Sequence, residues 1–98
     1  MTNYLIAPAA RQDLLDIISY IAARDSEAAT RVRHALLAAF DRLSERPALG
    51  HVRRDLTDLP VRFWTVAQRY AVVYRGEAGR IEIARVFSAG QDIASLLG

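Results

Sequence analysis

The fold is decided by residues 70–88, which read YAVVYRGEAGRIEIARVFS. Two runs in this stretch, Tyr70–Arg75 and Ile81–Phe87, are rich in the β-branched and aromatic residues that favour strands. Gly76–Gly79 lies between them and reads as a hairpin loop, since glycine adopts the backbone angles of tight turns. The alternation of apolar and polar residues in the second run is imperfect, so its faces stay unassigned and a β-bulge is one option. The stretch predicts an antiparallel hairpin within a sheet.

Upstream of this hairpin, the sequence adds two further strands and two helices. Val61–Val66 has strand composition, and Tyr4–Ile6 is a short strand that ends before a proline. Apolar residues at helical spacing predict one helix from Pro8 to about residue 24 and another from Asp25 or Ser26 to about residue 45. A link of two or three residues makes these helices an antiparallel hairpin.

The order strand–helix–helix–strand–strand–strand predicts an α+β fold with two layers. The helical hairpin covers one face of a mainly antiparallel sheet, and we expect the other face to be open. Arg46–Gly50 ends the second helix, a polar and basic connection follows to Pro60, and residues 93–98 form a short helix or an irregular end. The length of 98 residues predicts one domain, residues 1–98.

Composition excludes several classes of protein. The chain has no cysteine, which excludes disulfide frameworks, thiolate nucleophiles and cysteine-bound metals. It shows neither a secretory signal nor an apolar run long enough to span a membrane, so we expect a cytoplasmic protein. His34 and His51 are its only histidines. No nucleotide-binding or metalloprotease motif is present, and the sequence therefore predicts no metal and no cofactor.

Arginine is the most informative residue type, because all 13 basic residues are arginine. Residues 1–45 hold five arginines against six acidic residues, whereas residues 46–98 hold eight against five. We therefore expect an anionic partner to meet the C-terminal half. The candidate residues in that half are His51, Arg53, Arg54, Arg62, Arg69 and Arg85. An ordinary solvated basic face is the alternative interpretation.

Six segments in order resemble the RelE/ParE superfamily of toxin–antitoxin toxins. They read YLIAPAARQDL (4–14), IISYIA (17–22), RPALG (46–50), VRF (61–63), YAVVYR (70–75) and IEIARVFSAGQD (81–92). The resemblance implies a bacterial toxin with the predicted fold, which a cognate antitoxin neutralises in a hetero-oligomer. RelE-like members cleave messenger RNA on the ribosome, whereas ParE-like members poison DNA gyrase.

The lack of residues suited to proton transfer favours the ParE-like branch. Many superfamily members read Arg-Val-Leu-His-Gly-x-Arg-Asp where this chain has Ser88 for the histidine and Gln91 for the second arginine. RNA cleavage needs a proton acceptor and a donor beside the scissile phosphate, and serine is a poor one near neutral pH. The helix motif Asp13-Leu14-x-x-Ile17-x-x-Tyr20 also resembles the ParE branch. The leading prediction is therefore a gyrase inhibitor that is not an enzyme.

Two alternatives remain. The first is a ribosome-dependent nuclease that cuts messenger RNA, with His51 as acid or base and Arg53, Arg62 and Arg85 as phosphate clamps. The second is a non-toxic subunit that binds the antitoxin. For the ParE-like prediction, Arg53, Arg54, Arg62 and Arg85 are the residues that bind the target or a phosphate.

The two strand arginines, Arg62 and Arg85, allow two interpretations. If they are functional, they project from the open sheet face, and alanine substitution leaves the fold nearly intact. If they are structural, each one braces the sheet by pairing with an acid such as Glu82, Asp55 or Asp92. We also expect an antitoxin segment to place a helix in an apolar groove beside the helical hairpin.

Overall fold

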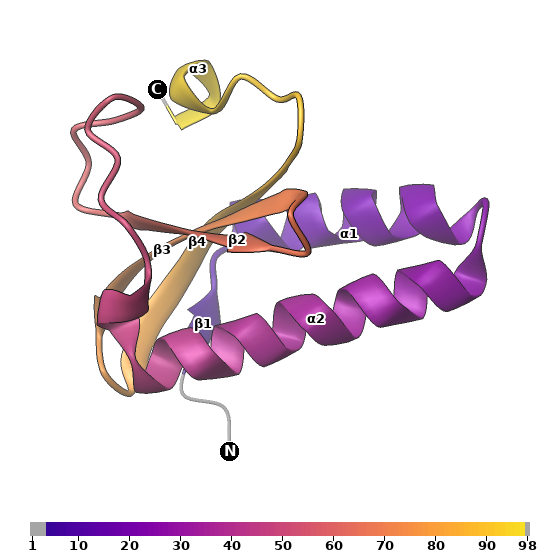
Figure 1. Cartoon of the computed structure of the whole chain (residues 1–98), viewed down its shortest axis with the longest axis horizontal. Helices are drawn as coiled ribbons and strands as arrows, with labels where there is room; N and C mark the ends of the chain where they lie inside the picture. The colour runs from indigo at the N-terminus through magenta and orange to yellow at the C-terminus, as the bar shows by residue number, and fades with distance from the viewer. Residues whose placement is uncertain (1–3, 98) are drawn as a thin grey trace.

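The computed structural model describes residues 4–97 and confirms the predicted order of elements (Figure 1). The elements are β1 (Tyr4–Ile6), α1 (Pro8–Ala22), α2 (Ser26–Glu45), the 3-10 helix η1 (Pro47–Leu49), β2 (Arg62–Val66), β3 (Tyr70–Glu77), β4 (Arg80–Ser88) and α3 (Ile93–Leu97). The strands of the hairpin are longer than expected, so only Ala78 and Gly79 separate them. The C-terminal segment forms the short helix that was one of its two predicted states.

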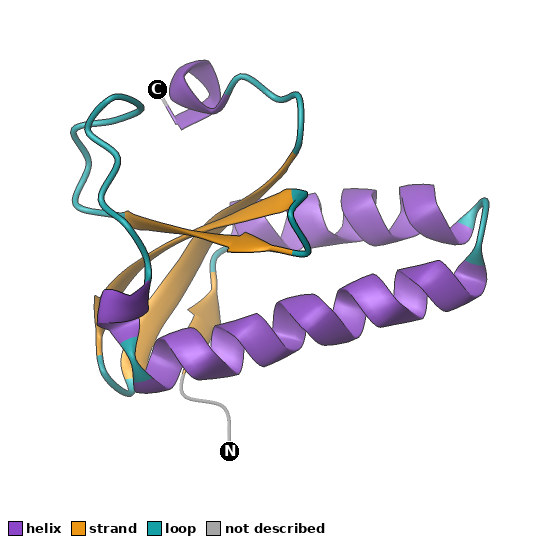
Figure 2. Cartoon of the chain, in the orientation of Figure 1, coloured by secondary structure: helices purple, strands orange, loops and turns teal. Residues whose placement is uncertain are grey.

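The ends of the two long helices follow from local chemistry. Pro8 occupies the first turn of α1, where its missing N–H costs no hydrogen bond. The side chain of Asp25 accepts a hydrogen bond of 3.0 Å from the backbone N–H of Ala28 and caps the start of α2. The two helices then run antiparallel, side by side, along one side of the molecule (Figure 2).

The sheet is mixed, with strand order β1-β4-β3-β2. The β2–β3 and β3–β4 pairs are antiparallel, and β1 joins the outer edge of β4 in parallel. The register shifts between Val73, which faces Arg85, and Tyr74, which faces Ile83, and Ala84 therefore has no partner on β3. This bulge explains the imperfect alternation of β4 and brings Val86 to the same face as Ile83.

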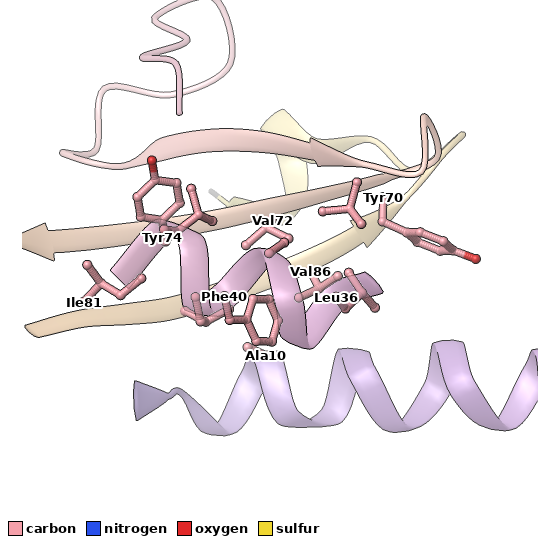
Figure 3. Packing of buried hydrophobic residues seen from close by; sticks show 12 residues of the cluster. Ala10, Leu36, Phe40, Tyr70, Val72, Tyr74, Ile81 and Val86 are labelled. Atoms are coloured by element: carbon pink, nitrogen blue, oxygen red, sulfur yellow. The ribbon is translucent and has the colours of Figure 1, made fainter. Parts of the chain in front are cut away.

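One face of the sheet forms the main core with α1 and α2. Figure 3 shows Phe40 of α2 packed between Ala10 of α1 and Val72 of β3. Ala10 and Phe40 are completely buried, and the small alanine side chain allows α1 to approach the sheet closely. This face therefore matches the predicted packing of the helical hairpin on the sheet.

The prediction of an open second face is wrong. Val61, Phe63, Val73 and Phe87 are buried on that face, and Leu56 from the connection before β2 and Ile93 and Leu97 from α3 pack against them. Figure 1 shows this connection and α3 on the side of the sheet away from α2. The physical reason is that two phenylalanine side chains on this face need an apolar cover, which short C-terminal helices and loops can supply.

The turn after α2 is fastened to β3 by one tyrosine. The hydroxyl of Tyr74 donates to the carbonyl of Pro47 and accepts a hydrogen bond of 2.8 Å from the N–H of Gly50. A Cβ at position 50 would overlap this hydroxyl, so the approach requires glycine. Burial raises the pKa of Tyr74, and the Gly50 N–H and the charge of Arg62 offset part of that rise.

Replacing Tyr74 by phenylalanine tests this attachment. The substitution removes both hydrogen bonds and leaves the buried N–H of Gly50 without a partner, which should lower the free energy of unfolding by about 2 kcal/mol. Tyr20→Phe is the matched control, because this tyrosine is 62% exposed, and its effect should stay within about 0.5 kcal/mol. Urea denaturation measures both values, and equal effects would contradict the role of Tyr74.

Candidate functional site

The four arginines proposed for the target site lie in three different places. Arg53 is exposed and pairs with Asp55, with 2.6 Å between Nη2 and Oδ2. Arg85 contacts helix α1. Arg54 and Arg62 line a cleft between the connection before β2 and the adjoining ends of β2 and β3. The structure therefore separates residues that the sequence grouped together.

This cleft, here called the basic cleft, has a volume of about 220 Å³. It is lined by three arginines, Arg54, Arg62 and Arg75, against one acidic residue, Asp58. Sequence analysis missed Arg75, since its place at the exposed end of β3 gives no pattern that separates it from a solvated residue. Arg75 also pairs with Glu82 on β4, with 2.7 Å between Nη2 and Oε1.

The cleft arginines differ in how firmly they are held. Arg62 donates from Nη1 to the carbonyl of Gly50 at 2.9 Å, so its guanidinium is held in place while its other N–H groups remain available. Arg54 is exposed and makes no side-chain hydrogen bond within residues 4–97. Guanidinium groups bind carboxylates and phosphates through paired hydrogen bonds, so the cleft suits an anionic group of a partner.

Neither histidine lies in the basic cleft. His51 pairs through its backbone with Phe63 of β2, and its exposed imidazole stacks on Trp64 with 6.4 Å between ring centroids. His34 is exposed on α2. Within residues 4–97, no group of three or more His, Asp or Glu side chains is arranged to hold a metal ion.

Two of the positions that depart from the superfamily motif, Ser88 and Gln91, bond to each other. Gln91 Oε1 accepts hydrogen bonds from the backbone N–H of Ser88 at 2.6 Å and from its hydroxyl at 3.1 Å. These two hydrogen bonds close the turn between β4 and α3. The serine hydroxyl is thus engaged in a local structural contact.

Arg85 is held by Asp13 of α1. Its Nε donates to Oδ2 at 2.8 Å and its Nη2 to Oδ1 at 3.0 Å, and the backbone N–H of Val86 donates to Oδ2 at 2.9 Å. The side chains of Arg85 and Asp13 are only 25% and 14% exposed. The hydrogen bond with Asp13 raises the pKa of Arg85 above its already high ordinary value.

This contact corrects the expectations for the strand arginines. Arg85 does not project from an open face, and its partner is Asp13 rather than Glu82, Asp55 or Asp92. The reason is topological: β1 ends at Ile6, so the edge of β4 beyond it has no strand partner, and α1 brings a carboxylate there instead. Arg62, in turn, bonds to a backbone carbonyl and not to an acid.

A second concave surface runs along the outside of the helical hairpin. This hairpin groove, with a volume of about 290 Å³, has an apolar floor that includes Leu14, Leu15 and Ile18. Arg11 of α1 and Arg33 of α2 also line it. Leu15 is 57% exposed, which is unusual for a large apolar side chain within a groove.

Comparison with known proteins identifies a relationship over most of the chain. The model of one family, the ParE toxin of the type II toxin–antitoxin system parDE, matches residues 4–93. A chain in a solved structure of the chromosomal ParDE TA system from P. aeruginosa aligns with a TM-score of 0.70 and 20% sequence identity, covering 90% of this chain and 96% of that one. A sequence search of curated proteins finds no match. At 20% sequence identity, the similarity to this solved structure shows a shared fold.

No helix in the described part of the chain is long and apolar enough to cross a membrane.

The Asp13–Arg85 contact predicts a large effect on stability. Asp13→Ala and Arg85→Ala should each lower the free energy of unfolding by about 2 kcal/mol, because each leaves a partly buried charge or N–H without its partner. The double variant should lose less than the sum of the two. Arg53→Ala is the control, since its exposed pair with Asp55 should leave the melting temperature unchanged. Fully additive losses from Asp13→Ala and Arg85→Ala would show that the two side chains are not coupled.

Proposed function

The chain belongs to the ParE toxin family of type II toxin–antitoxin systems, and from this premise we propose that it inhibits DNA gyrase in the cytoplasm and is neutralised by a cognate antitoxin. The basic cleft is the proposed contact for the target. Arg54, Arg62 and Arg75 are the residues in the cleft that would bind an anionic group of the target, with exposed Arg53 nearby in the chain.

The observation that carries this proposal is a cleft rich in cations that has no histidine among its lining residues. Cleavage of RNA by its own 2′-hydroxyl needs groups that accept and donate protons at the reacting atoms. Arginine remains protonated near neutral pH, and the hydroxyl of Tyr74 is engaged with Pro47 and Gly50. Among the described residues, Asp58 is the one lining carboxylate that could accept a proton, and the lining has no histidine to donate one. Such a cleft is suited to holding an anion without reacting with it, which supports binding as the mode of inhibition.

Arg85 contributes to this function in another way. Its guanidinium is bound to Asp13, at a place that the lining of the basic cleft does not include. We therefore propose that it maintains the toxin's fold and does not contact the target.

The hairpin groove is the proposed site for the antitoxin. An amphipathic helix could bury its apolar side on Leu14, Leu15 and Ile18. Arg11 and Arg33 would then meet acidic residues that flank the apolar side of this helix. Apolar burial should dominate the equilibrium affinity, whereas the arginines should mainly accelerate association.

A supercoiling assay with purified gyrase tests the proposed target. The protein should inhibit supercoiling and trap gyrase on cleaved DNA. Arg54→Gln should weaken inhibition about tenfold, because it removes a charged hydrogen-bond donor from the cleft. Arg31→Gln, which makes the same charge change on the exposed surface of α2, should inhibit like the parent protein.

Two results would overturn this proposal. Unaffected supercoiling and no trapped cleavage complex, with the protein in excess, would contradict gyrase as the target. Codon-positioned cuts in translated messenger RNA after induction would instead identify the ribosome-dependent nuclease.

Titration with the antitoxin encoded by the adjacent reading frame tests the hairpin groove. Leu15→Ala should weaken binding by about tenfold, because it removes apolar area from the contact. Leu96→Ala is the matched control, since this leucine is also exposed but lies on α3. Arg33→Gln should slow association and reduce its dependence on salt. Equal losses from both leucine variants would place the antitoxin elsewhere.

A further inference from the structure

A third cavity, between α1 and the C-terminal end of β4, differs in charge from the two surfaces above. This cavity, here called the α1–β4 pocket, has a volume of about 330 Å³. Asp13 and Asp16 are acidic residues of its lining, which contains no basic residue. Such a lining is notable in a chain whose formal net charge is +2.

Tyr70 is a polar residue of the pocket lining. The residue as a whole is only 6% exposed, and its hydroxyl makes no hydrogen bond within residues 4–97. No side-chain oxygen in the described residues is both fully buried and unbonded, so this hydroxyl reaches the solvent. Figure 3 shows its ring at the end of the sheet, with the hydroxyl directed away from Val86 and Leu36. A solvent-accessible hydroxyl can donate or accept without breaking a bond within the protein, so this one is available to a group that enters the pocket.

The charge of the pocket resides mainly on Asp16. Asp13 is neutralised by Arg85, whereas the carboxylate of Asp16 accepts a hydrogen bond of 2.8 Å from the neutral side chain of Gln12. The apolar part of the lining consists of Ile17, Ile21 and Val86. The pocket thus combines an anionic acceptor and a hydroxyl with an apolar surface.

Tyr20, another residue of the pocket lining, already contacts a guanidinium group of this chain. The Cζ of Arg24 lies 4.4 Å from the centroid of the Tyr20 ring, which is 62% exposed. This stacking position on Tyr20 is therefore taken by Arg24, and a preference for arginine over lysine has to come from the planar donors that meet Asp16 and Tyr70.

The sequence of this chain explains why the pocket is not filled from within. Gln91 stands where the superfamily motif has an arginine, and its side-chain oxygen is used by Ser88. Gln91 lines the same pocket as Asp16. No guanidinium of the chain therefore enters the lining at this position.

We propose that the α1–β4 pocket binds an arginine side chain of a partner protein. The methylene groups lie against Ile17, Ile21 and Val86, and the guanidinium donates to the carboxylate of Asp16 and to the hydroxyl of Tyr70. This site uses none of the residues proposed for gyrase or for the antitoxin groove, so it stands independently of both.

Titration followed by amide NMR shifts tests the proposal with N-acetyl-arginine amide, which resembles an arginine within a chain. We expect saturable shifts of Tyr70, Ser88 and Gln91, with N-acetyl-citrulline amide and N-acetyl-lysine amide at least about fivefold weaker, because they lack the charge or the planar donors. Asp16→Asn should weaken binding by a similar factor. Asp41→Asn, an exposed carboxylate on α2, is the matched control and should bind like the parent chain.

Gln91→Arg provides a variant that blocks the pocket while keeping the carboxylate of Asp16 and the hydroxyl of Tyr70. Its own guanidinium should occupy the pocket and abolish binding of the probe. A melting curve checks that the chain stays folded without the hydrogen bonds from Ser88 to Gln91. The proposal is overturned if citrulline or lysine binds as well as arginine, if Gln91→Arg leaves binding intact, or if Asp41→Asn weakens it as much as Asp16→Asn. Tighter binding of free arginine than of the blocked probe would point to a small-molecule ligand and contradict a protein partner.

Discussion

The carboxylate of Asp13 is the contact on which the arrangement of helices and sheet depends. It accepts hydrogen bonds from two nitrogens of Arg85 and from the N–H of Val86, residues more than 70 positions away in the chain. Strand β1 is too short to cover this part of the β4 edge, so the first helix supplies an acceptor in its place. The bulge at Ala84 sets the local register. The Asp13 side chain thus adds a polar contact between the helical layer and the sheet to the apolar core around Phe40.

This contact also separates the charged surfaces of the protein. Because Arg85 is bound to Asp13, it does not contribute to the basic cleft, which Arg54, Arg62 and Arg75 line near the opposite end of β3 from Tyr70. The same contact neutralises Asp13 and leaves Asp16 as the main charge in the α1–β4 pocket. A chain whose basic residues are all arginine therefore offers one surface suited to anions and another suited to a cation.

The motif residues that relate this chain to the ParE family have structural roles here. Pro47 and Gly50 of the segment after α2 bond to the hydroxyl of Tyr74, and Asp13 of the helix motif bonds to Arg85. These residues preserve contacts between distant elements, which is why their order in the sequence indicates the fold and family so well. For the same reason they carry little information about the target, whose proposed contacts are exposed residues such as Arg54.

The sequence by itself determined the succession of helices and strands, the start of the second helix at Asp25 or Ser26, and the relationship to ParE toxins, because propensity, periodicity and capping act between neighbouring residues. Only the tertiary structure decided which arginines are bound and which are available, and that α3 and the connection before β2 cover the second face of the sheet. It also brought Tyr70, Asp16 and Gln91 to one pocket. The physical reason is that ion pairs and burial depend on residues that meet only when distant strands and helices pack, and local spacing carries no record of those contacts.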